Sequence, residues 1–113
     1  MEERQIGYDV KAKYAQLIER LRTTSDGFVV FITSKAANTI VKSLTPSLAS
    51  NREKLIKEGV LFINGENLEF SDDFIFSSPS TAASIVLGRN ANGLTEWKDK
   101  KGKTLKEFET NEK

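Results

Sequence analysis

Two short apolar segments on either side of an Asn-Gly step constrain the fold of this chain more than any other feature. Residues 60–63 and 68–70 are the apolar segments, and residues 64–67 lie between them. An Asn-Gly step in that position is typical of a tight β-hairpin. Another apolar run, at residues 74–76, predicts a further short strand. The chain is therefore expected to build an antiparallel sheet.

The N-terminal segment, residues 1–25, has the spacing of an amphipathic helix. Charged residues occupy the positions between a set of regularly spaced apolar ones, which are Val10, Tyr14, Leu17, Ile18 and Leu21. This pattern predicts a helix over residues 9–22, which the polar turn at residues 23–27 ends. The continuous apolar run at residues 28–32 then predicts a strand that is buried on both faces.

The stretch that follows leaves two alternatives open. Residues 33–44 suit a helix that Thr33 or Ser34 would cap, because their apolar residues have helical spacing. They also suit a second strand at residues 39–41 that pairs with the preceding strand. Short apolar runs do not separate helix from strand by periodicity, and we favour the hairpin.

A helix is predicted next. Residues 45–49 contain a proline and are expected to form a connector. Ser50 and Glu53 match the S-x-x-E capping box, in which each side chain binds a free backbone N–H group. The helix is therefore expected to cover residues 51–58 and to end at Gly59.

Signals for another helix begin at Ser78. A serine suits the N-cap, and Pro79 suits the first helical position, where the missing N–H group is tolerated. The helix is expected to continue through residues 81–87 and to end at Gly88. The free N–H groups near Ser80 would either bind an anion or serve only to cap this helix.

The remaining residues predict a loop and a strand. Residues 90–93 are of the types that accept loop conformations, and the alternation in residues 94–98 predicts a strand. A hairpin turn is expected at residues 99–102, and a closing segment at residues 103–108. Residues 110–113 are expected to be a disordered tail.

Together these elements predict one α+β domain over residues 1–113, with a mostly antiparallel sheet and about three short helices. After the N-terminal helix, the domain is expected to contain a strand, helix and hairpin segment at residues 26–75 and a C-terminal module at residues 76–109. Hydrophobic residues make up 38% of the chain, which is enough for a modest core.

Residues 88–95, GRNANGLT, differ by one residue from the phosphate-loop pattern GxxxxGK[ST]. Leu94 stands where that pattern has its lysine. A phosphate loop also follows a strand and precedes a helix, whereas the order predicted in this chain is helix, loop and strand. Nucleotide hydrolysis is therefore not expected.

The composition excludes several kinds of chemistry. The chain has no cysteine and no histidine, so disulfides, thiol nucleophiles and imidazole catalysis are ruled out. Asp72 and Asp73 are adjacent, and in a strand they would point to opposite faces. We therefore expect a protein that is not an enzyme and has no cofactor or metal. The charged N-terminus and the lack of a long apolar run predict a cytoplasmic protein.

A series of short motifs in the C-terminal third of the chain resembles a known bacterial family, the one catalogued as domain of unknown function 4357. The motifs are Ser78-Pro79-Ser80, Ala82-Ala83, Gly88-Arg89, Asn92-Gly93 and Glu96-Trp97-Lys98. The sequence from about residue 26 onward is also similar to what precedes this module, except at Ile32-Thr33, where a lysine-glycine pair is expected. Proteins of this kind often carry a GIY-YIG nuclease domain or lie near restriction-modification systems. The module is distantly similar to the restriction-enzyme and adenine-methylase-associated domain.

The resemblance implies a role in nucleic-acid metabolism and no established activity. Our first hypothesis is a non-catalytic module that binds nucleic acid, most simply DNA, or a nuclease or restriction-system protein. Cations and an aromatic ring are the usual ingredients of such a surface, although Trp97 would otherwise anchor the core. The candidate contact residues are Ser80, Arg89, Asn92, Trp97, Lys98, Lys100 and Lys101. The alternative is a protein-interaction or dimerisation module, with the protein a monomer or weak homodimer.

Overall fold

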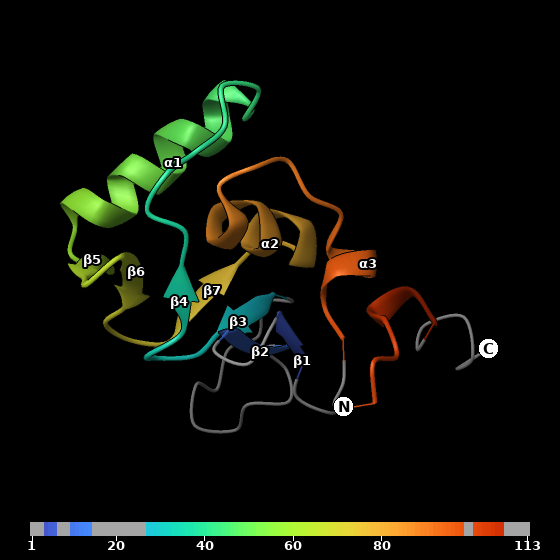
Figure 1. Ribbon diagram of the computed structural model, residues 1–113. Coiled ribbons are helices and arrows are strands. Elements are labelled where there is room, and N and C mark those ends of the chain that lie inside the picture. The colour runs from blue at the N-terminus through green and yellow to red at the C-terminus, as the bar shows by residue number, and fades with distance from the viewer. Residues whose placement is uncertain (1–3, 7–9, 15–26, 99–100, 108–113) are drawn as a thin grey trace.

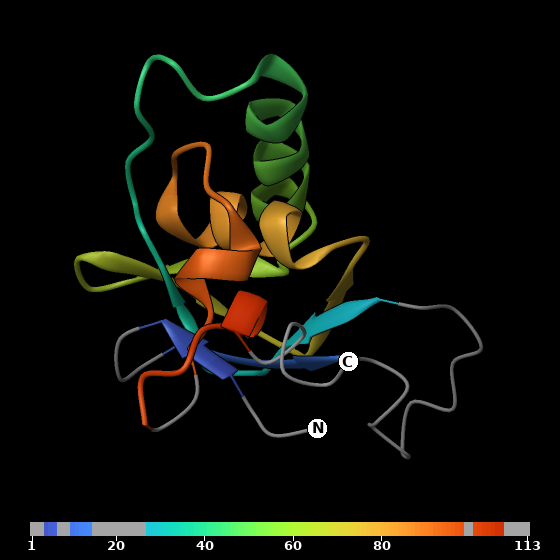
Figure 2. The same cartoon turned by 90° about the vertical axis from the view of Figure 1, so that its right-hand side faces the viewer.

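The computed structural model describes residues 4–6, 10–14, 27–98 and 101–107 of the chain. In these residues the chain forms two antiparallel sheets and a set of helices, so the predicted α+β class is confirmed. Figures 1 and 2 show the helices on one side of the strands in both views. No helix in the described ranges is both long enough and apolar enough to cross a membrane.

The first sheet has the strand order β1-β2-β3-β7. Its strands are β1 (Arg4–Ile6), β2 (Val10–Tyr14), β3 (Phe28–Val30) and β7 (Phe74–Phe76). All three pairings in the sheet are antiparallel. The strands predicted at residues 28–32 and 74–76 are therefore present, the first of them shorter than expected.

The helix predicted in segment 1–25 is wrong wherever the structure describes that segment. Residues 10–14 form β2, which pairs with β1 on one side and with β3 on the other. A strand with two neighbours satisfies its backbone groups on both edges, and this outweighs a helical spacing of only a few residues. Residues 15–22 of the predicted helix lie outside the described residues, as do Lys100, Phe108 and the predicted tail at 110–113.

The second sheet has the strand order β4-β6-β5 and contains the hairpin that the sequence predicts. Its strands are β4 (Lys35–Ala36), β5 (Leu61–Asn64) and β6 (Asn67–Phe70). Asn64 pairs with Asn67 at the end of the hairpin. Gly65 has a φ of 67°, so a glycine with left-handed backbone occupies the first position of the two-residue turn.

Neither alternative for residues 33–44 is correct. Only β4 is regular in this stretch, and it pairs with β6 instead of returning along β3. The rest of the stretch is a loop that helix α2 (Pro79–Leu87) holds: the Ala37 N–H donates to the Val86 carbonyl, and the Val41 N–H donates to the Gly88 carbonyl. These hydrogen bonds to residues 86 and 88 take the place of hydrogen bonds to an adjacent strand.

Helix α1 (Pro46–Lys57) begins earlier than predicted. Pro46 is at its first position, where a proline needs no N–H partner, so the supposed connector is helical. The predicted capping box therefore lies inside the helix. The predicted end is confirmed, because Gly59 follows the last turn with a φ of 83°.

Helix α2 lies at the centre of the molecule, beside α1 and over the strands (Figures 1 and 2). Its predicted boundaries are confirmed: the Ser78 side chain accepts a hydrogen bond from the Thr81 N–H, and Gly88 is left-handed at φ 72°. Its buried apolar side chains join the main hydrophobic core, and they are Ala82, Ala83, Ile85 and Val86.

The strand predicted at residues 94–98 is wrong. Residues 93–96 form a single helical turn, α3 (Gly93–Glu96), which Asn92 caps by accepting a hydrogen bond from the Leu94 N–H. Beyond α3, Lys98 makes isolated bridges with Gln5 and Thr104 and belongs to no named strand. A local cap thus determines the conformation, although alternation of side-chain types favours a strand.

Candidate functional site

The loop after α2 folds back and covers the first turn of that helix. The Gly93 N–H donates a hydrogen bond of 2.9 Å to Ser80 Oγ. A Cβ atom at Gly93 would lie 2.3 Å from the Pro79 carbonyl carbon, a separation that real Cβ atoms do not show. Only glycine therefore fits at position 93, and the serine-proline-serine and asparagine-glycine motifs form one contact.

Trp97 closes the same contact from inside. Its side chain is fully buried, its indole Nε1–H donates a 2.9 Å hydrogen bond to the Pro79 carbonyl, and its ring centroid lies 5.0 Å from that of Phe28. A ring in this position is part of the core and offers no face to a base. The structure therefore places Trp97 where the core-anchor alternative does.

The N–H groups at the start of α2, which the sequence offers as an anion site, are bonded or covered by other groups of the protein. The Thr81 N–H donates to Ser78 Oγ, and the Ala82 N–H donates to the Ser78 carbonyl. The hypothetical Cβ of Gly93 would lie 2.5 Å from Ser80 N, which shows how closely the loop covers that amide. These contacts support the capping alternative for the first turn.

The asparagines of the loop are structural. Asn92 caps α3, as described above. The Asn90 Oδ1 accepts hydrogen bonds from the N–H and hydroxyl groups of Thr45, and its Nδ2 donates to the Ser43 carbonyl. Asn90 thus ties the loop to the start of α1. The sequence does not indicate this role, because its partners lie far back along the chain.

Arg89 stays at the surface. Its Nη2 lies 3.3 Å from Glu96 Oε2, and the two side chains are 46% and 28% exposed. The pair bridges the loop between Gly88 and α3, so the arginine and the glutamate of the motif series neutralise each other in part. An exposed pair of this kind contributes about 0–1 kcal/mol to stability.

Of the other predicted contact residues, Lys98 and Lys101 are exposed. Lys98 follows Trp97 directly, so a cation at the surface adjoins a ring in the core. The structure therefore divides the candidate set in two. Ser80, Asn92 and Trp97 make hydrogen bonds to backbone groups, whereas the candidate cations present their charges at the surface: Lys98, Lys101, and Arg89 with its ion pair to Glu96.

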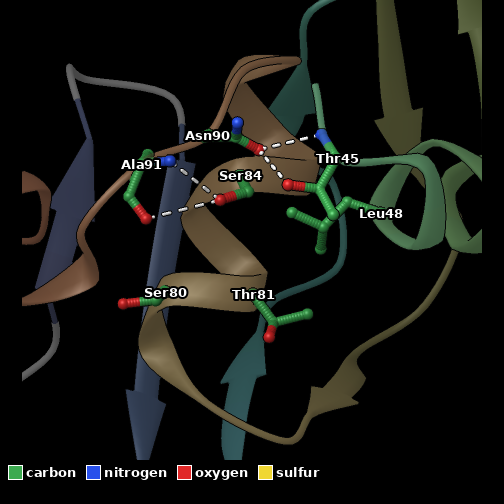
Figure 3. A pocket seen from close by; sticks show the side chains of 7 residues that line it. All are labelled: Thr45, Leu48, Ser80, Thr81, Ser84, Asn90 and Ala91. Atoms are coloured by element: carbon green, nitrogen blue, oxygen red, sulfur yellow. Dashed lines mark hydrogen bonds between the residues drawn. The ribbon is translucent and has the colours of Figure 1, made fainter. Parts of the chain in front are cut away.

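A pocket of about 260 Å³ lies between α1, α2 and the loop (Figure 3). It is lined by Thr45, Leu48, Ser80, Thr81, Ser84, Asn90 and Ala91. Figure 3 shows that several of these polar groups bind one another: the Ala91 N–H donates 3.0 Å to Ser84 Oγ, and Thr45 donates to Asn90. The lining is neutral throughout, so it contains no general acid or base. Elsewhere in the described ranges, no three Asp or Glu side chains are grouped to hold a metal ion.

Charge is distributed unevenly over the described residues. From α1 to β7, six acidic side chains accompany three basic ones; over residues 88–98 and 101–107, two acidic side chains accompany five basic ones. The basic ones are Arg89, Lys98, Lys101, Lys103 and Lys106. In Figure 1 the β5–β6 hairpin and the C-terminal segment lie at opposite sides of the molecule. The basic side chains are therefore concentrated in the C-terminal part of a chain whose net charge is only +1.

Two ionisable groups have shifted pKa values. The side-chain hydrogen bond from Lys35 lowers the pKa of Glu69, and a second hydrogen bond from Asn64 adds to the effect. Burial lowers the pKa of Arg52, whose guanidinium donates to the carbonyl oxygens of Ile85 and Ala37. Both groups are tied to neighbouring elements, and neither faces the pocket.

One comparison with known proteins gives a match. The family model described as "Domain of unknown function (DUF4357)" matches residues 10–109. No curated protein and no solved structure matches the chain. The matched region contains every motif of the α2 loop as well as both sheets from β2 onward.

Proposed function

The chain belongs to the DUF4357 family, and on that premise we propose that it is a non-catalytic module that binds nucleic acid through contacts with the phosphate backbone. The observation that carries the proposal is the basic patch, which we define as Arg89, Lys98, Lys101, Lys103 and Lys106. The module is proposed to act beside a nuclease or restriction-system protein, the kind of partner that the resemblance implies.

The segment that carries the four lysines of the basic patch contains buried anchor residues. Trp97 and Leu105 are fully buried, and the Leu105 N–H donates to the Trp97 carbonyl. Lys98 directly follows Trp97, and Lys106 directly follows Leu105, so each of these exposed lysines is next to a buried anchor. Fixed cations bind a polyanion with a smaller loss of conformational entropy than lysines on a free tail do.

Burial of the tryptophan changes the kind of binding that we propose. Because the Trp97 ring is buried and cannot stack on bases, affinity has to come mainly from neutralising phosphates, which is largely independent of sequence and steeply dependent on salt. The neutral pocket supplies no cation, so we assign it no part in a binding that depends on neutralising phosphates.

The test is a salt titration of binding to double- and single-stranded DNA and RNA. The variant Lys98→Glu/Lys106→Glu reverses two charges in the basic patch, and we expect it to weaken binding and to flatten the salt slope by about 1 for each lost contact. The matched control is Lys54→Glu/Lys57→Glu, which makes the same change of charge on the last turn of α1. It should bind as the wild type does.

Two results would count against the proposal. If the wild-type protein binds none of the four nucleic acids at low salt, the module has another function. If both double variants weaken binding equally, the protein responds to total charge only, and the basic patch is not a site. Circular dichroism of each variant checks that the fold is intact.

A second candidate function is homodimerisation through β5, the edge strand of its sheet. Ile63 is 70% exposed and Phe62 is 39% exposed. The Val60 carbonyl, just before β5, accepts a hydrogen bond from the Ser71 N–H, so every second residue from Val60 onward is hydrogen-bonded to β6. The backbone groups of the residues between them, Leu61 and Ile63, therefore point to the free edge of the sheet. An antiparallel second copy can pair Leu61 with Ile63 of its partner, which puts Phe62 opposite itself.

The absence of native cysteine makes this second candidate easy to test. Residues opposite each other in a non-hydrogen-bonded antiparallel pair are close enough for a disulfide. Under mild oxidation, Phe62→Cys should form a covalent dimer, whereas Ile40→Cys, which is also exposed but lies in the loop between β4 and α1, should not. Equal cross-linking of both variants, or of neither, would exclude this pairing.

A further inference from the structure

The chain contains two Asn-Gly steps, Asn64–Gly65 and Asn92–Gly93, and the surroundings of the two steps differ in the structure. Asparagine followed by glycine is the dipeptide that loses its side-chain amide most readily, because glycine leaves the approach to the side chain open. We infer that Asn64 is a site of spontaneous deamidation in the folded protein and that the fold protects Asn92. This inference is independent of the proposed function, since it concerns the hairpin and not the basic patch.

The reaction requires no catalyst other than water and hydroxide. Hydroxide removes the proton of the glycine N–H, and the nitrogen forms a bond to Cγ of the preceding asparagine. The bond from Cγ to the side-chain amide nitrogen then breaks, and this nitrogen takes up a proton from water and leaves as ammonia. Water then opens the five-membered imide at one of its two carbonyls, which yields aspartate or isoaspartate. Closure of the imide ring needs the glycine nitrogen to move toward the asparagine side chain.

The Asn64–Gly65 step meets that requirement. Asn64 is exposed, and Gly65 occupies the first position of a two-residue turn. The hydrogen-bond ladder closes at the Asn64–Asn67 pair, so the Gly65 amide lies beyond it and faces solvent. A Cβ atom added to Gly65 would meet no heavy atom within 4 Å. The nitrogen therefore has open space around it, and the side-chain hydrogen bond that has to break, from Asn64 Nδ2 to Glu69 Oε1, is exposed to solvent.

The Asn92–Gly93 step does not meet it. The Gly93 N–H is engaged with Ser80 Oγ at 2.9 Å, and Gly93 lies against the backbone of Pro79. The Asn92 Oδ1 accepts a 2.9 Å bond from the Leu94 N–H, which holds the side chain in its capping position. Forming the imide would require these contacts to break together.

Conversion at Asn64 would change the electrostatics of the second sheet. The Asn64 Nδ2 donates a 2.8 Å hydrogen bond to Glu69 Oε1, and Glu69 also pairs with Lys35 of β4. An aspartate in that place loses the donor and puts a second carboxylate beside Glu69. Isoaspartate also lengthens the main chain by one carbon and disturbs the pairing with Asn67. The modified hairpin is therefore more negative and less firmly held.

Peptide mapping by mass spectrometry tests the inference, with the protein incubated in mildly alkaline buffer. In the folded protein, the Asn64 peptide should convert roughly tenfold or more faster than the Asn92 peptide, which corresponds to a barrier difference of about 1.4 kcal/mol. In denaturant the two rates should become similar. The inference is wrong if Asn92 converts as fast as Asn64 in the folded protein, or if Asn64 converts only in denaturant.

Two variants sharpen the result. Ser80→Ala removes the acceptor of the Gly93 N–H, so it should accelerate conversion at Asn92 and leave the rate at Asn64 unchanged. Asn64→Gln lengthens the side chain, and it should abolish conversion at position 64 without affecting position 92. If Ser80→Ala leaves Asn92 as slow as before while the protein stays folded, hydrogen bonding by Ser80 is not what protects that site.

Discussion

The Nη1 of Arg52 donates a 2.8 Å hydrogen bond to the carbonyl oxygen of Ile85, deep inside the protein. Ile85 belongs to the last turn of α2, whose carbonyls have no partner within the helix. The guanidinium also donates to the Ala37 carbonyl, so one side chain joins α1, α2 and the loop after β4. The positive charge lies at the negative end of the α2 dipole, which compensates it in part.

Replacing Arg52 should therefore be costly. Arg52→Met keeps the apolar stem and leaves two carbonyls without a donor, so we expect the free energy of unfolding to fall by about 2–4 kcal/mol. Urea denaturation measures the change. Lys54→Met, at an exposed position of the same helix, should stay within about 0.5 kcal/mol of wild type. Similar losses in both variants would mean that Arg52 contributes only general helix stability.

Position 93 should accept no side chain. Gly93→Ala puts a methyl group into the backbone of Pro79, and neither segment can move without breaking the Trp97 hydrogen bond. We expect a loss of about 1–3 kcal/mol in the free energy of unfolding. The comparison variant is Gly102→Ala, which meets only the strain of a left-handed backbone, because no atom lies within 4 Å of its Cβ. A smaller effect at position 93 than at position 102 would contradict the close packing.

Trp97 is the single tryptophan, so its fluorescence reports on its surroundings directly. A fully buried indole should emit at short wavelength and resist quenching by acrylamide. Adding DNA or RNA should leave the emission unchanged, because the ring does not stack on bases. Emission typical of a solvent-exposed indole, or strong quenching by nucleic acid, would show that Trp97 leaves the core.

Glu69 should make stability depend on pH in the acid range. Its pKa in the folded protein lies below the ordinary value of 4.5, first because of the hydrogen bond from Lys35. A depressed pKa gives stability that is present above the pKa of the unfolded chain and is lost as the pH falls through the folded pKa. Wild type should exceed Glu69→Gln in urea midpoint at neutral pH, and the difference should vanish in acid. A difference that is independent of pH would rule out the ionic part of this interaction.

Arg89 and Glu96 should affect nucleic-acid binding in opposite directions. Arg89→Ala removes a cation from the basic patch and should weaken binding, whereas Glu96→Gln releases Arg89 from its partner and should strengthen it. Both effects should fade as salt rises, since exposed charges are screened. Binding titrations at low and moderate salt measure them. If both variants weaken binding, the geometry of the ion pair matters more than the free cation.

Local signals in the sequence predicted the elements that depend on local chemistry. The β5–β6 hairpin, the Ser78 cap of α2 and the glycine at position 88 all follow from a few adjacent residues. Some elements with distant partners were missed, although the apolar runs of β3 and β7 did predict those two strands. The strand β2 exists because β1 and β3 pair with it, and no local pattern shows those partners.

For the candidate site, too, the sequence found the roles that depend on the residue itself and missed those that depend on distant partners. Exposure of Arg89 and Lys98 follows from their charge, which is why the sequence found them. The binding partners of Ser80 and Trp97 lie on the other side of the loop, so the sequence alone left their roles open. Arg52 gave no signal, because an arginine in an amphipathic helix is usually at the surface.

Both ends of α2 depend on other parts of the chain. Loop residues 92–97 complete its first turn, whereas Ala37 and Arg52 complete its last. The expected boundary between residues 75 and 76 therefore separates α2 from two residues that donate hydrogen bonds to it, Ala37 and Arg52. A fragment limited to residues 76–109 would keep the donors to the first turn of α2 but lack those to its last turn, and it should remain unfolded in isolation. Mixing it with the complementary N-terminal fragment should restore structure to both pieces at once.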